Sequence, residues 1–114
     1  MGIQQWSDDI VVVDLSDDPQ FSEDMNALLE QLEHTPCDVV LGFSAVGFIN
    51  SSNVAKLLRL RKALILAERQ LVLCDVNAQV WGVFQVTGLD KIFEFTADVS
   101  TALATVQLTN GAGD

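Results

Sequence analysis

The chain contains a single histidine, His34, and only two cysteines, Cys37 and Cys74. A nucleophilic serine needs a neighbouring base. The single histidine is expected near the end of a helix, where a histidine usually provides a favourable charge beside the last backbone carbonyls. The cysteines have neither metal-ligand nor redox spacing, so we expect two reduced thiols near buried strands in a cytoplasmic protein. No Gly-rich phosphate loop is present, and the acidic residues are scattered along positions expected at the surface. The sequence therefore predicts a non-enzymatic binding module without a cofactor or metal ion.

Basic residues are also scarce, since 6 Lys and Arg face 16 Asp and Glu, for a formal net charge of −10. Binding to a phosphate backbone needs a basic surface, so direct contact with nucleic acid is not expected. Five of the six basic residues lie between Lys56 and Arg69, a cluster typical of a solvated helix face. The acidic remainder favours a partner with basic patches. Charges interrupt every apolar run, and the N-terminus lacks the pattern of a secretory signal, so we expect no membrane insertion.

With 114 residues and 49% hydrophobic side chains, the chain has the size and composition of one globular domain. We place this domain at residues 1–108 and a flexible tail at 109–114. Apolar runs predict strands at residues 3–6, 10–15, 39–43, 71–74 and 92–95, and helices are expected after Pro19, from Ser51, from Asn77 and over 98–108. This alternation indicates an α/β fold: a mostly parallel sheet of four to five strands with about four helices.

The helix expected from Ser51 has an amphipathic pattern. At about 100° per residue, its predicted core face consists of Val54, Leu57, Leu58, Leu64 and Ile65. Arg61 falls inside this arc, so its aliphatic stem is expected along the edge of the core.

The start of this helix is the most informative part of the chain, and it reads Asn50-Ser51-Ser52-Asn53. The first turn of a helix leaves backbone N–H groups without partners and carries the positive end of the helix dipole. A phosphate attached to one of these serines would therefore be favoured there. The alternative is that Ser51 or Ser52 simply caps the helix, a role worth about 1 kcal/mol.

Two blocks of sequence, in order, resemble the STAS domain found in sulfate-transporter tails and anti-sigma factor antagonists. The first block is Val46-Gly47-Phe48-Ile49, then Ser51-Ser52 at a helix start and the run Leu57-Leu58-Arg59-Leu60-Arg61-Lys62. The second is Leu71-Val72-Leu73, then Val80, Phe84 and Thr87-Gly88-Leu89-Asp90-Lys91-Ile92-Phe93. Together the blocks extend the resemblance from about Ile10 to Leu108, and they imply a single STAS domain.

The resemblance to anti-sigma factor antagonists implies a partner-switching role. In that family the partner is an anti-sigma factor that is also a serine kinase, and it releases the antagonist after phosphorylating it. A phosphoserine phosphatase reverses the modification. Carried to this chain, the resemblance implies Ser51 as the phosphate acceptor. The partner surface is expected to include Asn50, Ser52, Asn53, Val54, Asp17, Asp18 and Trp81.

Several of these positions admit a second interpretation. The family's switch members have Asp at the position of Asn50 and Gly at that of Asn53, so the domain could instead be a scaffold that binds partners in signalling or transport without being phosphorylated. Asp17-Asp18 is also typical of a turn that enters a helix. Trp81 is either an exposed anchor for a partner or a partly buried ring at the core edge. An enzymatic or nucleotide-binding variant has no supporting motif.

Overall fold

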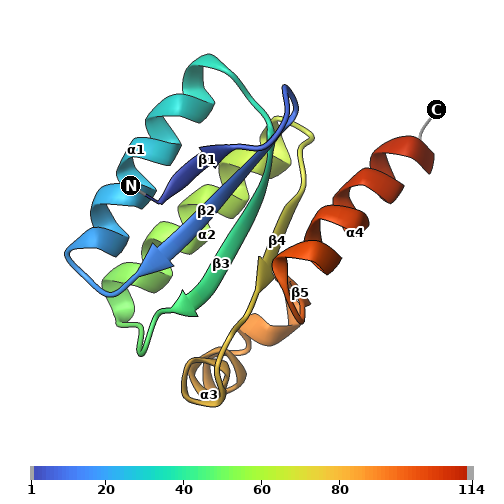
Figure 1. Cartoon of the computed structure of the whole chain (residues 1–114). Helices are drawn as coiled ribbons and strands as arrows, with labels where there is room; N and C mark the ends of the chain where they lie inside the picture. Colours follow the sequence, from blue (N-terminus) through green and yellow to red (C-terminus); the bar gives the residue numbers. More distant parts are fainter. Residues whose placement is uncertain (1, 113–114) are drawn as a thin grey trace.

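The computed structural model of the chain describes residues 2–112. Its five strands form one sheet in the order β1-β2-β3-β4-β5, in which β1 pairs antiparallel with β2 and each later pair is parallel (Figure 1). In chain order the elements are β1 (Ile3–Gln5), β2 (Ile10–Ser16), α1 (Gln20–His34), β3 (Asp38–Ala45), α2 (Ser51–Leu66), β4 (Leu71–Cys74), α3 (Ala78–Thr87), the 3₁₀ turn η1 (Leu89–Lys91), β5 (Glu94–Thr96) and α4 (Val99–Ala112). The predicted α/β fold class is confirmed.

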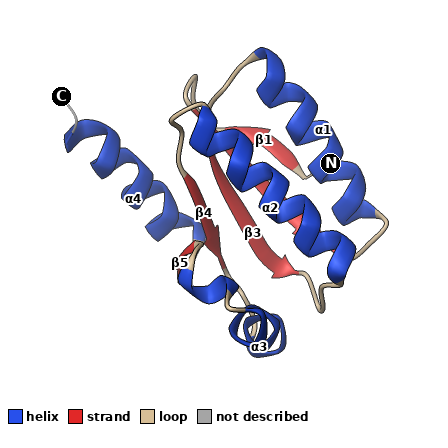
Figure 2. Cartoon of the chain, turned by 180° about the vertical axis from the view of Figure 1, so that it is seen from behind, coloured by secondary structure: helices blue, strands red, loops and turns tan. Residues whose placement is uncertain are grey.

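Helices cover both faces of the sheet. Helices α1 and α2 lie side by side on one face, and α4 packs on the other (Figures 1 and 2). Because alternate residues of a strand point to opposite faces, Val11 and Val39 join the core under α1 and α2, whereas Val12 and Val40 join the core under α4. Right-handed crossovers between consecutive parallel strands place α1 and α2 on the same face. The β2–α1 and β3–α2 loops consequently meet at the carboxyl edge of the sheet.

The core face of α2 differs from the prediction. Leu60 is fully buried, whereas Leu58 and Ile65, which were expected inside, are 39% and 54% exposed. The buried positions are Asn53, Leu57, Leu60 and Leu64. The predicted arc was centred too far around the helix because a polar residue, Asn53, was not counted as part of the core face. Arg61 lies at the core edge as expected, and its Nε donates to the carbonyl of Ile92 at 3.3 Å.

Helix α4 continues to Ala112, past the predicted end at Leu108. Of the predicted tail at 109–114, residues 113–114 lie outside the described residues, and the flexibility of the tail stays a prediction. No helix within residues 2–112 is both long and apolar enough to span a membrane.

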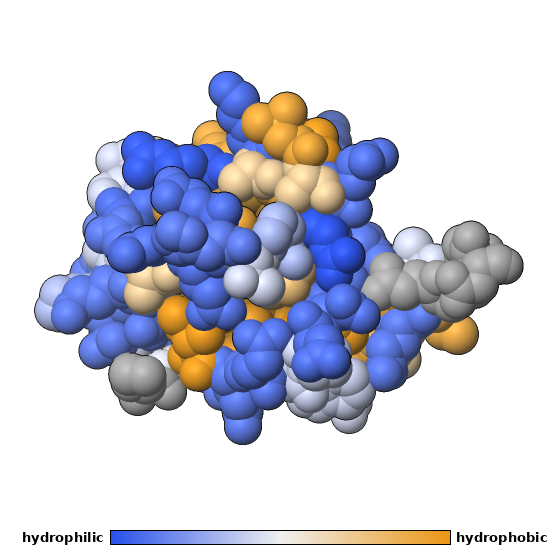
Figure 3. All heavy atoms as spheres, turned by 90° about the horizontal axis from the view of Figure 1, so that it is seen from above, coloured by the Kyte–Doolittle hydropathy of each residue, from blue (hydrophilic) through white to orange (hydrophobic). Residues whose placement is uncertain are grey.

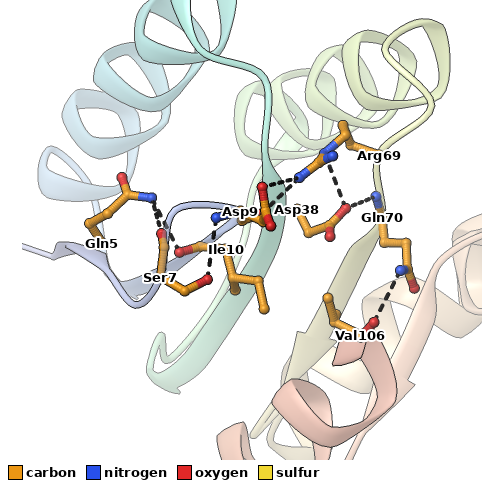
Figure 4. Close-up of polar contacts among 8 residues, drawn as sticks. All are labelled: Gln5, Ser7, Asp9, Ile10, Asp38, Arg69, Gln70 and Val106. Carbon is orange, nitrogen blue, oxygen red and sulfur yellow. Dashed lines mark hydrogen bonds and ion pairs between the residues drawn. The ribbon is translucent and has the colours of Figure 1, made fainter. Parts of the chain in front are cut away.

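A polar network closes the edge of the sheet at which the parallel strands begin (Figure 4). The buried Asp38 carboxylate accepts the backbone N–H of Gln70 at 2.8 Å and lies 3.4 Å from Nε of Arg69. Arg69 also donates through Nη2 to the carbonyl of Asp9 at 3.0 Å, and the Gln70 side chain reaches the carbonyl of Val106 in α4 at 3.3 Å. Arg69 therefore ties together the β1–β2 turn, the start of β3 and the start of β4. It does not belong to the solvated helix face that was expected for the basic cluster.

Candidate functional site at the start of helix α2

The two loops at the carboxyl edge of the sheet are joined by Asp17. Its Oδ1 accepts the backbone N–H of Gly47 at 2.9 Å, which links the β2–α1 loop to the β3–α2 loop. A Cβ atom at position 47 would lie 3.4 Å from Oδ2 of Asp17, which is ordinary van der Waals contact, so the hydrogen bond does not itself require glycine there. The sequence-predicted residues Asp17 and Asn50 thus belong to one surface, although 32 intervening positions separate them in the chain.

Asparagine side chains, rather than the serines, cap helix α2. Asn50 occupies the N-cap with an extended backbone, and its Oδ1 accepts the backbone N–H of Asn53 at 2.8 Å. Asn53 returns the contact, because its Oδ1 accepts the backbone N–H of Asn50 at 3.1 Å. This reciprocal capping box satisfies two backbone donors that the first turn leaves open. The alternative that Ser51 or Ser52 caps the helix is wrong.

Ser51 and Ser52 are consequently exposed and available for other chemistry. They are the first two residues of α2, where helix geometry directs backbone N–H groups outward at the positive end of the dipole. The hydroxyl of Ser52 accepts a hydrogen bond from Nζ of Lys56, one turn later, at 3.3 Å. The two hydroxyls therefore differ: within the described residues, the Ser52 hydroxyl is hydrogen-bonded to a cationic side chain and the Ser51 hydroxyl is not.

Asp18 connects the starts of α1 and α2. Its Oδ1 accepts both the hydroxyl of Ser22 at 2.7 Å and the backbone N–H of Ser22 at 3.0 Å. Its Oδ2 accepts Nδ2 of Asn53 at 2.9 Å and faces Nδ2 of Asn50 at 3.5 Å. The hydroxyl of Ser22, followed by the amide of Asn53, stabilises the ionised form and holds the pKa of Asp18 below its ordinary value. Asp18 thus places a negative charge beside the neutral Asn50.

The remaining predicted partner residues differ in accessibility. Asn53 is only 2% exposed, so it positions the site from within, and its burial argues against the direct partner contact that we predicted. Val54 is half-buried on the second turn. Trp81 lies apart, on α3, where it is half-buried and its ring packs edge-on against Phe95 with centroids 4.9 Å apart. This packing is the core-edge placement that we gave as the alternative to an exposed anchor.

One residue that sequence reasoning did not select is Phe48. Its side chain is 59% exposed in the β3–α2 loop, two residues before the helix cap. The neighbouring Val46 and Ile49 are buried, and they fix the loop so that Phe48 projects outward. Phe48 belongs to the apolar run Val46-Gly47-Phe48-Ile49, which lies in a loop outside any strand, so no strand periodicity distinguishes the exposed Phe48 from the buried Val46 and Ile49.

The described residues offer no evident centre for metal or thiol chemistry. Within residues 2–112, no group of three His, Cys, Asp or Glu side chains is placed to hold a metal ion. Both thiols are buried, as expected, and burial raises the pKa of Cys74 to about 12 and raises that of Cys37 as well. Such thiols stay protonated near neutral pH and are weak nucleophiles.

The chain matches the family model of the STAS domain over residues 8–102. No curated protein matches the sequence closely enough to count as a relative. Among solved structures, a serine-to-glutamate variant of RsbS from Moorella thermoacetica superposes with a TM-score of 0.82 at 18% identity, over 95% of both chains. The anti-sigma factor antagonist SpoIIAA in its unphosphorylated form gives a TM-score of 0.80 at 19% identity, over 92% of this chain and 94% of SpoIIAA. Bacillus SpoIIAA in its phosphorylated form gives 0.73 at 18% identity, over 91% of this chain and 96% of that chain. At such identities the structural likeness establishes a shared fold.

Proposed function

The chain belongs to the STAS domain family, and we propose that it acts as an anti-sigma factor antagonist in a bacterial partner-switching module. In this proposal the start of α2 binds an anti-sigma factor that is also a serine kinase, and phosphorylation of Ser51 releases it. A phosphoserine phosphatase resets the switch. The protein itself is a cytoplasmic binding module, and its net charge of −10 makes nucleic acid an unfavourable direct partner.

The observation that carries the proposal is that Ser51 is exposed at the start of a helix that other side chains already cap. The capping box satisfies the backbone N–H groups of Asn50 and Asn53 without the Ser51 hydroxyl, so modification of Ser51 removes no side-chain bond of this cap. The structures of SpoIIAA in unphosphorylated and phosphorylated forms show that its fold is found in both states, which supports such a switch on this scaffold.

A phosphate on Ser51 would act on the interface rather than on the fold. Within the domain, a dianion at a helix N-terminus is favoured by the dipole. Against a partner, the same dianion must lose its water, and an unpaired buried charge costs several kcal/mol. Asp17 and Asp18 already make this edge acidic, so the modified surface is still less suited to a partner region that is neutral or acidic.

The proposed partner surface combines one apolar group with small polar ones. Phe48 supplies an exposed aromatic side chain, a type enriched among the residues that dominate binding energy. Asn50, Ser51 and Ser52 follow it closely in sequence and are exposed as well. Asp17 is also exposed and adds negative charge to this surface. Trp81 is left as a secondary contact, because much of its ring is packed against Phe95.

The second candidate function is a scaffold that binds partners without being phosphorylated. Asn50 is the observation that favours it, since its neutral amide stands where the family's switch members have a carboxylate. In this chain Asp18 supplies a carboxylate close to that amide, with its Oδ2 3.5 Å from Nδ2 of Asn50. The two functions differ on one point. The switch requires the Asp18 carboxylate to assist phosphorylation of Ser51 in place of a carboxylate at position 50, whereas the scaffold does not.

Isothermal titration calorimetry with a candidate anti-sigma factor kinase, sought among the genes adjacent to this one, tests the proposal. The wild-type domain should bind, and Ser51→Glu should bind at least about tenfold more weakly, which corresponds to about 1.4 kcal/mol. Ser52→Glu is the matched control, because it adds the same charge one residue later. Equal affinities for wild type and Ser51→Glu would favour the scaffold.

A further inference from the structure

The C-terminal halves of α1 and α2 enclose an apolar groove that the proposed switch does not use. It has a volume of about 270 Å³ and is lined by Leu29, Leu32, Glu33, Pro36, Ala63, Leu64, Leu66 and Ala67. Leu66 is 76% exposed beside it, although Leu is among the side chains most often found inside proteins. Figure 3 looks down on this end of the molecule and shows an apolar patch at the top, where α2 ends, bordered by hydrophilic side chains. Such a rimmed apolar patch is typical of an interaction site.

Charges of opposite sign border the two sides of the groove. Helix α1 presents the exposed Glu30 and Glu33, and helix α2 presents the exposed Arg59 and Lys62. Within residues 2–112, the only ion pairs are those of Arg69, so these four side chains are not paired with one another. One side of the groove is therefore acidic, the other is basic, and the strip between them is apolar.

This arrangement is complementary to a second copy of itself. The two-fold axis of such a pair runs along the groove, in the plane of the contact. Rotation about it leaves the helices of the two copies pointing the same way along the groove and places α1 of each copy against α2 of the other. The acidic side of each copy then faces the basic side of its partner, and the two apolar strips meet at the centre. Such an isologous contact uses one patch on both chains. We propose that this groove is the contact of a homodimer of the chain.

The dimer contact is separate from the proposed switch. Ser51 begins α2 and Leu66 ends it, so these two residues lie about 22 Å apart along a helix with a rise of 1.5 Å per residue. Arg59, the residue of the contact that is nearest to Ser51 along α2, lies about 12 Å from it. A dimer would thus carry two switch sites, both outside the contact. At physiological salt the Debye length is about 8 Å, which screens the repulsion between two chains of net charge −10 but leaves close pairs across the contact largely intact.

Sedimentation equilibrium over a concentration series at physiological salt tests the proposal. Wild type should show a monomer–dimer equilibrium, and Leu66→Asp should abolish the dimer by placing a charge in the apolar strip. Val86→Asp is the matched control, because Val86 is 89% exposed on α3 and distant in sequence from the groove. Circular dichroism should show that all three proteins are folded. The proposed switch is not needed for this result, so Ser51→Ala should dimerise like wild type.

A charge exchange tests the orientation of the two copies. Glu30→Lys and Lys62→Glu should each weaken the dimer by roughly tenfold, because each replaces two attractive contacts across the axis with two repulsive ones. The double variant should recover most of the wild-type affinity. A wild-type chain that stays monomeric at every concentration would overturn the proposal and leave the groove to a different protein. A dimer that survives Leu66→Asp, or that the double variant fails to restore, would overturn it as well.

Discussion

Asn53 donates a 2.9 Å hydrogen bond from Nδ2 to Oδ2 of Asp18, and this contact ties the start of helix α2 to the loop that precedes α1. The same Asn53 completes the capping box with Asn50 through its Oδ1. One buried amide therefore fixes both the helix start and the neighbouring loop. The proposed acceptor, Ser51, is displayed on this support.

Replacement of Asn53 should reduce stability more than replacement of an exposed asparagine. Asn53→Ala removes hydrogen bonds to Asn50 and Asp18 and leaves their groups less well satisfied, so we expect a loss of about 2 kcal/mol in the free energy of unfolding. Asn26→Ala, on the exposed side of α1, should change it by less than about 0.5 kcal/mol. Urea unfolding followed by circular dichroism measures both. Equal effects at the two positions would contradict the structural role of Asn53.

Loss of the Ser51 hydroxyl should leave the domain as stable as wild type. Because Asn50 caps α2, Ser51→Ala should shift the free energy of unfolding by less than about 0.5 kcal/mol. Asn50→Ala should cost about 1 kcal/mol, the usual value for loss of an N-cap. Thermal and urea unfolding of the two variants provide the comparison. A loss of about 1 kcal/mol in Ser51→Ala would mean that the serine caps the helix after all.

A carboxylate at position 50 should trade stability for reactivity. Asn50→Asp keeps the acceptor for the N–H of Asn53 and places a charge beside Ser51, so phosphorylation should become faster. It also replaces the 3.5 Å contact between the Asn50 amide and Asp18 with repulsion between two carboxylates, so the free energy of unfolding should fall. Single-turnover phosphorylation and urea unfolding measure the two effects.

The control for this variant removes the repulsion. Asn50→Asp combined with Asp18→Asn should regain stability relative to Asn50→Asp alone, because only one carboxylate remains. An unchanged phosphorylation rate in Asn50→Asp would show that the neutral Asn50 does not limit the reaction. The corresponding change at position 53 is a poor test of kinase access, because the Asn53 side chain is buried and Asn53→Gly would remove part of the cap.

The hydrogen bonds to Asp18 predict how acid weakens the domain. The folded-state pKa of Asp18 lies below its ordinary value of 3.8, so the unfolded chain takes up a proton at this residue first as the pH falls. Asp18 therefore contributes stability that is present above that value and is lost as the pH falls through the lowered pKa. The difference in unfolding free energy between wild type and Asp18→Asn should shrink on acidification across this window. A difference that stays constant with pH would contradict the account.

The sequence was sufficient for the fold because its strands are strongly apolar and its helices are clearly bounded. Val39 and Val40 are buried on opposite faces of β3, as a continuous apolar run between two helix layers predicts. The helix expected from Asn77 is α3, which Asn77 caps, with Oδ1 accepting the N–H of Val80 at 2.8 Å. The face of α2 was predicted less well, because the burial of Asn53 depends on a distant partner.

The site could be predicted only in part for the same reason. The position of Ser51 at a helix start follows from local sequence, but the contacts of Asp17 with Gly47 and of Asp18 with Asn53 cross from one loop to another. Hydrophobic periodicity carries no information about such pairs. The same holds for Trp81, whose half-burial depends on Phe95, a residue that follows it by 14 positions on a different element.

The most direct test of the central claim is to map the phosphate after incubation with Mg-ATP and the anti-sigma factor kinase that binds the domain. Mass spectrometry of the digested protein should locate a single phosphate on Ser51. The label should disappear in Ser51→Ala and persist in Ser52→Ala, a variant that loses only the contact with Lys56 at this site. A phosphate on Ser52, or full labelling of Ser51→Ala, would contradict the assignment of Ser51 as the switch residue.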